Sequence, residues 1–169
     1  GGTEWRAAAQ DGQMSFSCDG KQTTLPLPSL AGPHQIDNAG AALACLQIIK
    51  GFEISMDALA NGLCHIHWPA RLQRLADPAP GWELWLDGAH NDSGAEVLTD
   101  QIRAWGNALP LHLVTAMKST KNIGEFYQPL LPHAVTVQAV DVSWIEAPMT
   151  PAESLCDQLM QLGCRQAVV

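Results

Sequence analysis

The chain has 169 residues, a hydrophobic content of 47% and a formal net charge of −8. This composition can fill a packed core and excludes a disordered chain. The charge is uneven, because residues 1–75 carry five Lys/Arg and six Asp/Glu, whereas residues 76–169 carry four and eleven. Such a balance argues against nucleic acid and anionic membranes as partners, since nothing offsets phosphate repulsion, but it allows a local pocket for one nucleotide.

Cysteine content and hydropathy bear on the compartment. The cysteines are odd in number and widely spaced, without a Cys-x-x-Cys pair, and this predicts a cytoplasmic protein with reduced thiols. They are Cys18, Cys45, Cys64, Cys156 and Cys164. No apolar run reaches about 18 residues, and the N-terminus lacks a signal-peptide pattern, so no membrane segment is predicted. The chain starts without Met, and we expect it to be part of a longer protein.

Residues 3–28 are typical of a β-meander. Asp-Gly pairs at 11–12 and 19–20 are spaced for two tight hairpins. Between these pairs, apolar and polar residues alternate, which predicts a strand with one buried face. The residues expected on that buried face are Met14, Phe16 and Cys18.

Two helices are expected after the meander. Apolar residues recur at helical spacing over 36–50, and Ser55 is a candidate N-cap for a second helix. The side chains expected to face inward are Ile36, Ala39, Leu43, Leu46, Ile49, Met56, Leu59 and Leu63. A Pro/Gly-rich segment at 77–81 then predicts a domain boundary, so that residues 1–76 form an incomplete first domain.

Residues 77–169 alternate strands with helices. We predict strands at 82–87, 111–116, 134–140 and 167–169, and helices at about 93–107, 122–131 and 151–162. This order is typical of an α/β fold with a Rossmann-like, mostly parallel sheet and helices on both faces. The helical side chains expected to face inward are Leu98, Ile102, Trp105, Ile123, Phe126, Tyr127, Leu130, Leu155, Leu159 and Leu162. The chain stops on the fourth strand, so this second domain is also expected to be truncated.

The turn Asp-Gly-Ala-His-Asn at 87–91 is the most informative stretch of the sequence. It follows the apolar run 82–86, which is typical of a buried strand, and it precedes a helix. Ligands of open α/β sheets bind just beyond the carboxyl ends of strands. Asp87 there can accept hydrogen bonds from two adjacent hydroxyls, such as those of a ribose, while Asn91 or Asp92 can cap the helix.

Two earlier segments carry further candidate ligands. The polar start of the helix near 34–38 reads either as a solvated N-terminal cap or as a site where the Asn38 amide meets a base. An amide donates and accepts at once, which suits adenine. Arg71 reads either as a surface arginine or as a fixed cation aimed at nucleotide phosphates. A ligand held between the two domains could contact Asn38, Arg71 and Asp87.

Other kinds of site are disfavoured. Cys-His-Ile-His at 64–67 has its imidazoles two residues apart and no second pair at metal spacing, so a zinc site is not expected. An aspartyl phosphate on Asp87 is disfavoured, because Ala89 stands where such enzymes carry a second acid. The sequence contains neither a P-loop motif nor a Gly-x-Gly-x-x-Gly motif. Lys118 and Lys121 are either solvated loop residues or anion binders.

Three motifs together resemble one family. They are His-Gln-x-x-Asn-Ala at 34–39, Trp-Pro-Ala-Arg-Leu-Gln at 68–73 and Leu-Asp-Gly-Ala-His-Asn at 86–91. In this order and at this spacing they resemble the bifunctional dihydrofolate synthase/folylpolyglutamate synthases of the Mur ligase superfamily. The resemblance covers nearly the whole chain, but only the later part of such an enzyme. Residues 1–76 would end its central ATP-binding domain, and 77–169 would belong to its C-terminal glutamate-ligase domain.

The resemblance implies a reaction and a set of contacts. These enzymes activate a pteroate or folate carboxylate with ATP, and the amino group of L-glutamate attacks the acyl phosphate. Asn38 would contact the base region, Arg71 the phosphates and Asp87 the ribose, with His90 near the adenine. His34, Gln35 and Lys121 are additional candidates. A monomer is expected.

The chain also departs from the family pattern. Ala70 stands where the family usually has glycine, and Thr120 and Asn122 replace the acids of an Asp-Lys-Asp loop whose lysine matches Lys121. The phosphate-binding loop, the Mg²⁺ ligands and most of the folate site belong to the N-terminal region of such enzymes. No catalytic residue and no metal ligand is therefore assigned in this chain, and we expect it to be inactive alone.

Two alternatives to this function remain open. One is a Mur-type ligase for another pair of amino acid and carboxylate. The other is a non-catalytic nucleotide-binding module with the same fold. Substrate trials on the full-length protein separate the first alternative from the folate ligase, and the sequence encoded upstream of Gly1 separates the second.

Overall fold

The computed structural model describes residues 4–106, 108–144 and 146–169. The chain divides into two compact units, Gly1–Gly88 and Ala89–Val169. The division lies later than the predicted boundary after residue 76, because β4 (Gln73–Arg74) pairs with β5 (Trp85–Leu86) and keeps the intervening loop in the first unit. Within the described residues, no helix has both the length and the apolar character to cross a membrane.

The first unit begins with the predicted meander. β1 (Trp5–Gln10), β2 (Gln13–Cys18) and β3 (Lys21–Pro26) form an antiparallel sheet in that order. Both Asp-Gly pairs have positive φ at both residues, which is the backbone of the turn that matches the twist of a two-residue hairpin. Met14, Phe16 and Cys18 are buried, as predicted, because side chains alternate between the faces of a strand.

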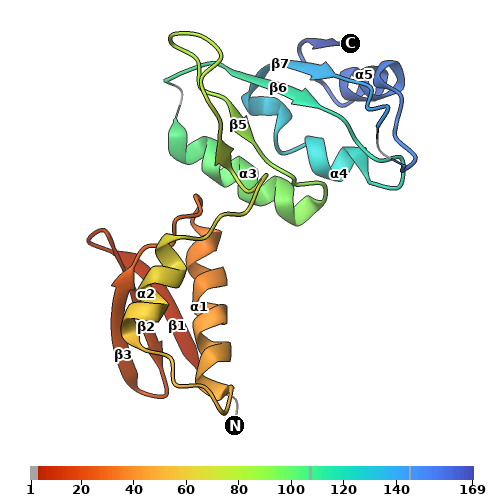
Figure 1. Cartoon of the computed structure of the whole chain (residues 1–169). Helices are drawn as coiled ribbons and strands as arrows, with labels where there is room; N and C mark the ends of the chain where they lie inside the picture. The colour runs from red at the N-terminus through yellow and green to blue at the C-terminus, as the bar shows by residue number, and fades with distance from the viewer. Residues whose placement is uncertain (1–3, 107, 145) are drawn as a thin grey trace. The chain divides into compact units, whose positions relative to one another are not determined.

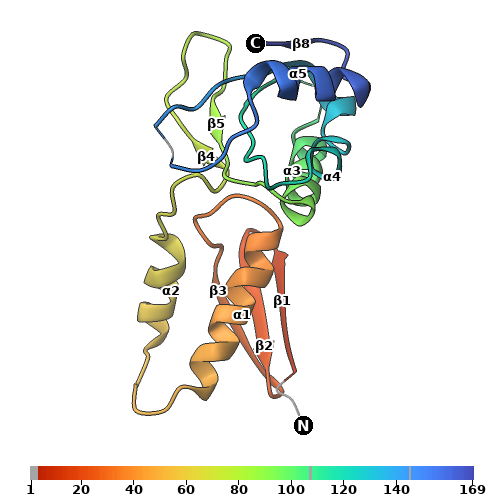
Figure 2. The same ribbon diagram turned by 90° about the vertical axis from the view of Figure 1, so that its right-hand side faces the viewer.

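Two helices cover this sheet. α1 (His34–Ile48) lies alongside β1 and β2, and α2 (Met56–Cys64) contacts β3 (Figures 1 and 2). The Ser55 side chain caps α2 by accepting from the Ala58 N–H at 3.2 Å, as predicted. Among the residues predicted to face inward, Ala39, Leu43 and Leu63 are buried, and Ile36 and Leu59 are partly buried against the same core. The expectation was wrong for Ile49 and Met56, which are exposed because they lie at the helix ends.

The predicted strand at 82–87 is much shorter than expected. Only Trp85 and Leu86 are in strand conformation, and they pair antiparallel with β4 instead of joining a parallel sheet. Trp82, Leu84 and Leu86 are 52%, 42% and 44% exposed, so the prediction of a buried strand was wrong. A run of apolar residues indicates burial only where another layer covers it, and β4 provides a single two-residue partner.

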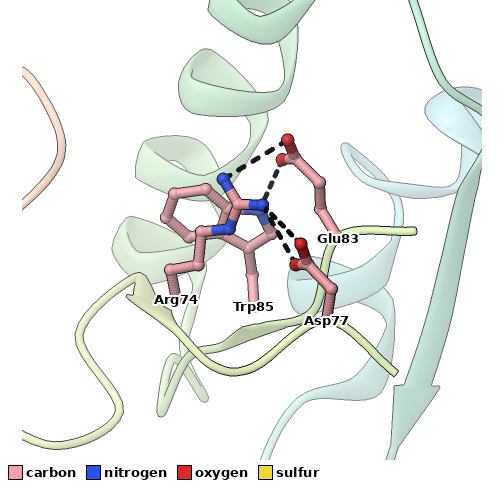
Figure 3. A network of polar contacts seen from close by, with 4 residues as sticks. All are labelled: Arg74, Asp77, Glu83 and Trp85. Atoms are coloured by element: carbon pink, nitrogen blue, oxygen red, sulfur yellow. Dashed lines mark hydrogen bonds and ion pairs between the residues drawn. The ribbon is translucent and has the colours of Figure 1, made fainter. Parts of the chain in front are cut away.

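Charged residues stabilise this hairpin. Figure 3 shows the Arg74 guanidinium over the ring of Trp85, 5.8 Å from its centre, and hydrogen bonded at 3.0 Å to both oxygens of Asp77. Glu83 lies 3.4 Å from the other nitrogen of Arg74 and accepts from the Trp85 indole N–H at 3.1 Å. All of these ion pairs are exposed, so solvent screens them and they contribute little to stability.

The second unit has the predicted α/β fold. β6 (Leu111–Thr115), β7 (Ala134–Ala139) and β8 (Ala167–Val168) form a parallel sheet in that order. α3 (Asp92–Trp105), α4 (Ile123–Tyr127) and α5 (Ala152–Gln161) connect or precede these strands, and α5 contacts β7 and β8. Their order along the chain is the alternation that the sequence predicts.

Some details of these helices differ from expectation. α4 ends at Tyr127 instead of continuing to 131, because Pro129 has no N–H to donate to the Glu125 carbonyl. A short 3₁₀ helix, η1 (Leu131–His133), follows it. Trp105 and Leu162 are 39% and 37% exposed, so they do not face inward as predicted. The other predicted inward-facing residues are buried or packed against the core of this unit: Leu98, Ile102, Ile123, Phe126, Tyr127, Leu130, Leu155 and Leu159.

Tyr127 makes the stability of the second unit sensitive to alkaline pH. Its side chain is 1% exposed, and its hydroxyl shares a 2.6 Å hydrogen bond with Thr115 Oγ1. Burial raises the pKa of Tyr127 above 10.0, and the bond to Thr115 lowers it by less. Because the folded pKa is raised, the stability is complete below the pKa of the unfolded tyrosine and is lost as pH rises through the folded value. We expect the free energy of unfolding to fall above about pH 10 for this reason.

The variant Tyr127→Phe tests this expectation. It should cost about 1 kcal/mol at neutral pH through the lost hydrogen bond, and its unfolding free energy should fall less steeply above pH 10. Urea unfolding at several alkaline pH values measures both effects. Tyr127 is the single tyrosine of the chain, so its tyrosinate absorbance can be titrated directly. Equal alkaline slopes in the two proteins would contradict the role of Tyr127.

Candidate functional site

The start of α1 carries three linked polar side chains. Asn38 Nδ2 donates to Gln35 Oε1 at 3.1 Å, and Gln35 Nε2 lies 2.8 Å from His34 Nε2. Gln35 is 5% exposed, whereas Asn38 is exposed. The expectation of a simple solvated cap is therefore incomplete, because α1 has no side-chain N-cap hydrogen bond and its polar residues bond to one another.

The His34 side chain is closely packed and partly buried. Its Nδ1 is buried without a hydrogen-bond partner, and a β-carbon at Gly32 would lie 2.5 Å from the ring carbon Cε1. Gly32 also has φ +112, a conformation that favours glycine. Burial lowers the pKa of His34, the nearby Arg71 lowers it further, and Asp87 and Asp37 oppose these effects. The imidazole is therefore neutral at pH 7 and lies within electrostatic reach of Arg71 and Asp87.

The loop after α2 is bonded to the turn that contains Asp87. The Leu72 backbone N–H donates to Asp87 Oδ2 at 2.7 Å, and the Gly88 N–H donates to the Ala70 carbonyl at 2.9 Å. Gln73 Oε1 accepts from the Ala70 N–H at 3.0 Å, which closes the loop on itself. These bonds hold the 68–73 motif against Asp87 and Gly88 within the first unit.

Arg71 projects from this loop toward solvent. Its guanidinium lies 5.8 Å from the centre of the Trp68 ring, a geometry that favours a cation over an aromatic face. An open pocket of about 320 Å³ adjoins it, at the lower end of the size range of small-molecule sites. Its lining includes Ser29, His67, Trp68, Arg71, Arg74 and Trp85. A guanidinium and indole faces at one opening suit an anionic, planar ligand.

Ala70 has an unusual backbone conformation, with φ +56. A residue with a β-carbon pays about 1–2 kcal/mol there, whereas glycine pays none. Ala70→Gly should therefore raise the free energy of unfolding by about 0–1.6 kcal/mol, after about 0.4–1 kcal/mol is subtracted for the more flexible unfolded chain. Ala76→Gly is a matched control, because Ala76 is exposed and has no positive φ, and it should lower stability. Equal losses in both variants would contradict strain at Ala70.

Two candidate residues lie in the second unit. His90 is exposed in the segment before α3, and the neighbouring Asn91 caps that helix by accepting from the Gly94 N–H at 3.0 Å, as predicted. Lys121 is partly buried next to Asn122, which caps α4 by accepting from the Glu125 N–H. The structure therefore gathers His34, Gln35, Asn38, Arg71 and Asp87 within the first unit, and it places His90 and Lys121 in the second.

Sequence reasoning missed several residues that shape this site. Gln73 and Leu72 belong to the second motif, but nothing in their spacing indicates that they bond to Ala70 and Asp87. Gly32 carried a signal, since a glycine two residues before a helix start often marks a special backbone conformation. Among the described residues, no group of three or more His, Cys, Asp or Glu side chains could hold a metal ion.

Comparisons with known proteins show what this chain is similar to. No family model matches the sequence. Dihydrofolate synthase/folylpolyglutamate synthase from Bacillus subtilis is 33% identical over 94 residues, which are 54% of this chain and 21% of the relative. Dihydrofolate synthetase from Saccharomyces cerevisiae is 29% identical over 154 residues, which are 83% of this chain and 36% of that relative. The chain thus spans about a fifth to a third of the length of these curated relatives.

A solved structure extends the match to the fold. The structure of E. coli FolC in complex with ADP, without folate substrate, has a TM-score of 0.78 and 27% identity, and it covers 98% of this chain and 37% of FolC. The folylpolyglutamate synthase of Thermotoga maritima has a TM-score of 0.72 and covers 99% of this chain. This chain is therefore similar in sequence and in fold to part of the dihydrofolate synthase/folylpolyglutamate synthases.

Proposed function

We propose that this chain is part of an ATP-dependent ligase that adds L-glutamate to dihydropteroate, to tetrahydrofolate, or to both, through an acyl phosphate. The observation that carries the proposal is that Asn38, Arg71 and Asp87, which come from three separate motifs, lie in one unit. Hydrogen bonds from the Leu72 N–H to the Asp87 carboxylate and from the Gly88 N–H to the Ala70 carbonyl join two of these motifs. The first motif, at the start of α1, lies within electrostatic reach of both through His34.

The residues present fit a nucleotide. The exposed Asn38 amide would meet the base, the Asp87 carboxylate the ribose hydroxyls, and the Arg71 guanidinium the phosphates. Each group is of the kind that recognises that part of a nucleotide: an amide edge for adenine, an acceptor for hydroxyls and a guanidinium for phosphate. His90 and Lys121, which belong to the second unit, are further candidate nucleotide ligands.

The chemistry itself needs parts that this chain does not carry. ATP, with a divalent metal ion that we take to be Mg²⁺, would supply the phosphoryl group that activates the carboxylate. A phosphate-binding loop and carboxylate ligands for Mg²⁺ are expected elsewhere in the parent protein. The present residues bind and orient the nucleotide, while the α/β unit would help to hold L-glutamate. We further propose that the parent is a cytoplasmic monomer that binds neither nucleic acid nor membranes.

The experiment is an assay of the longest natural reading frame that contains this sequence. We expect ADP formation that depends on L-glutamate and on dihydropteroate or tetrahydrofolate. The chain of 169 residues alone should release no ADP in the same assay. Activity only with another amino acid or another carboxylate would replace the folate assignment by a different Mur-type ligase. Nucleotide binding without turnover of any such pair would indicate a non-catalytic module.

A further inference from the structure

The hydrogen bonds that link Asn38, Gln35 and His34 at the start of α1 have a defined order of donors and acceptors. A side-chain amide donates only through its nitrogen and accepts only through its oxygen. Asn38 Nδ2 donates to Gln35 Oε1, so Gln35 must present its nitrogen to His34, and His34 Nε2 must accept. The proton of the neutral imidazole is then on Nδ1, the atom that lies buried against Gly32.

This direction determines what Asn38 offers to a ligand. One Nδ2–H is used by Gln35, so the carbonyl oxygen and the second Nδ2–H remain for the exposed side of the residue. An acceptor beside a donor matches the edge of adenine, which presents an amino group beside a ring nitrogen. If these hydrogen bonds ran in the opposite direction, Asn38 would offer two N–H donors, which match the oxygen and ring nitrogen of a 6-oxopurine.

The surroundings of these side chains are compatible with the first direction of the hydrogen bonds. Gln35 is 5% exposed, so water does not compete for its amide. Reversal would need a His34 that donates from Nε2, either as the other tautomer or as the imidazolium. Burial and Arg71 disfavour the charged form of His34, while Asp87 and Asp37 favour it. The net effect of these groups leaves His34 neutral at pH 7.

We propose that His34 and Gln35 are positioning residues, which hold the Asn38 side-chain amide in the orientation that selects adenine over a 6-oxopurine base. The proposal rests on the proposed function, because it assumes that Asn38 contacts the nucleotide base. It adds that the selectivity of this contact is set by two residues that do not touch the base.

The test is the ratio of the dissociation constants for ITP and ATP, measured by equilibrium binding to the full-length protein. The two nucleotides share ribose and triphosphate, so the ratio isolates the base. We expect the wild-type protein to prefer ATP by about tenfold or more. Gln35→Met fills the same space without an acceptor for Asn38 and should bring the ratio to within about twofold of unity.

Gln35→Glu is the matched control. A carboxylate oxygen still accepts from Asn38 Nδ2, so this variant should keep the preference for ATP. A ratio in Gln35→Met that equals the wild-type ratio would overturn the proposal. Loss of the preference in Gln35→Glu to the same degree as in Gln35→Met would also overturn it, because a general disturbance of α1 would then explain both.

Asn38→Ala separates this proposal from the function on which it rests. If Asn38→Ala also keeps the wild-type ratio, then Asn38 does not read the base and the proposed contact fails. If Asn38→Ala loses the preference for ATP over ITP while Gln35→Met keeps it, only the positioning role fails. Should Gln35→Met not fold, as judged by circular dichroism, His34→Phe provides the second variant. It removes the acceptor for Gln35 and should lower the ratio in the same way.

Discussion

Replacing Leu155 by alanine is expected to lower the free energy of unfolding of the second unit by about 2–5 kcal/mol. Leu155 lies on α5, is 0% exposed and belongs to a core that includes Val137 on β7 and Tyr127 on α4. Its removal takes apolar area away from contact and leaves a cavity that neighbours on three elements cannot fully close. Urea unfolding followed by circular dichroism measures the change.

Met160→Ala on the same helix is the matched control. Met160 is 50% exposed, so its truncation should change the free energy of unfolding by about 0.5 kcal/mol or less. The two variants remove side chains of similar volume from helix α5, and both create the same residue. A loss at Leu155 no greater than the loss at Met160 would contradict the position of α5 against the parallel sheet.

Local signals were sufficient for most of the elements. Asp-Gly pairs need positive φ at both positions of a two-residue hairpin, so the turns and the register of the meander follow from the sequence. Ser55 and Asn91 cap their helices because a short polar side chain at a helix start satisfies free backbone N–H groups. Such signals lie within a few residues of what they determine.

Burial of the segment around β5 could not be predicted in the same way. Trp82, Leu84 and Leu86 alternate as a strand would, but their environment depends on which element pairs with them. The early end of α4 follows from Pro129, whose missing N–H outweighs the apolar periodicity of the segment. The prediction at residue 107 falls outside the described residues.

The composition of the site was readable from the sequence, but its internal bonding was not. Asn38, Arg71 and Asp87 stand in motifs, and the structure brings these three residues into the first unit. The bond from the Leu72 N–H to Asp87 Oδ2 spans fifteen residues, and no local pattern reports it. The positive φ of Ala70 was also hidden, although the departure from glycine at this position was visible.

Asp87→Ala in the full-length protein is expected to weaken ATP binding by about 1–3 kcal/mol, the range for polar groups left without partners. If Asp87 binds the ribose, its carboxylate accepts from the hydroxyls, and alanine cannot replace it. The same variant also removes the acceptor of the Leu72 N–H, which should lower thermal stability. Calorimetric titration with ATP and thermal unfolding measure the two effects separately.

Asp87→Asn separates the nucleotide contact from the structural bond. Asparagine keeps one acceptor oxygen, and the Leu72 N–H at 2.7 Å from Oδ2 already engages that position. Stability should therefore stay close to wild type, whereas ATP affinity should fall nearly as far as in Asp87→Ala. The wild-type protein should also bind 2′-deoxy-ATP less well than ATP, and Asp87→Asn should narrow that difference. Wild-type ATP affinity in Asp87→Asn would refute the ribose contact.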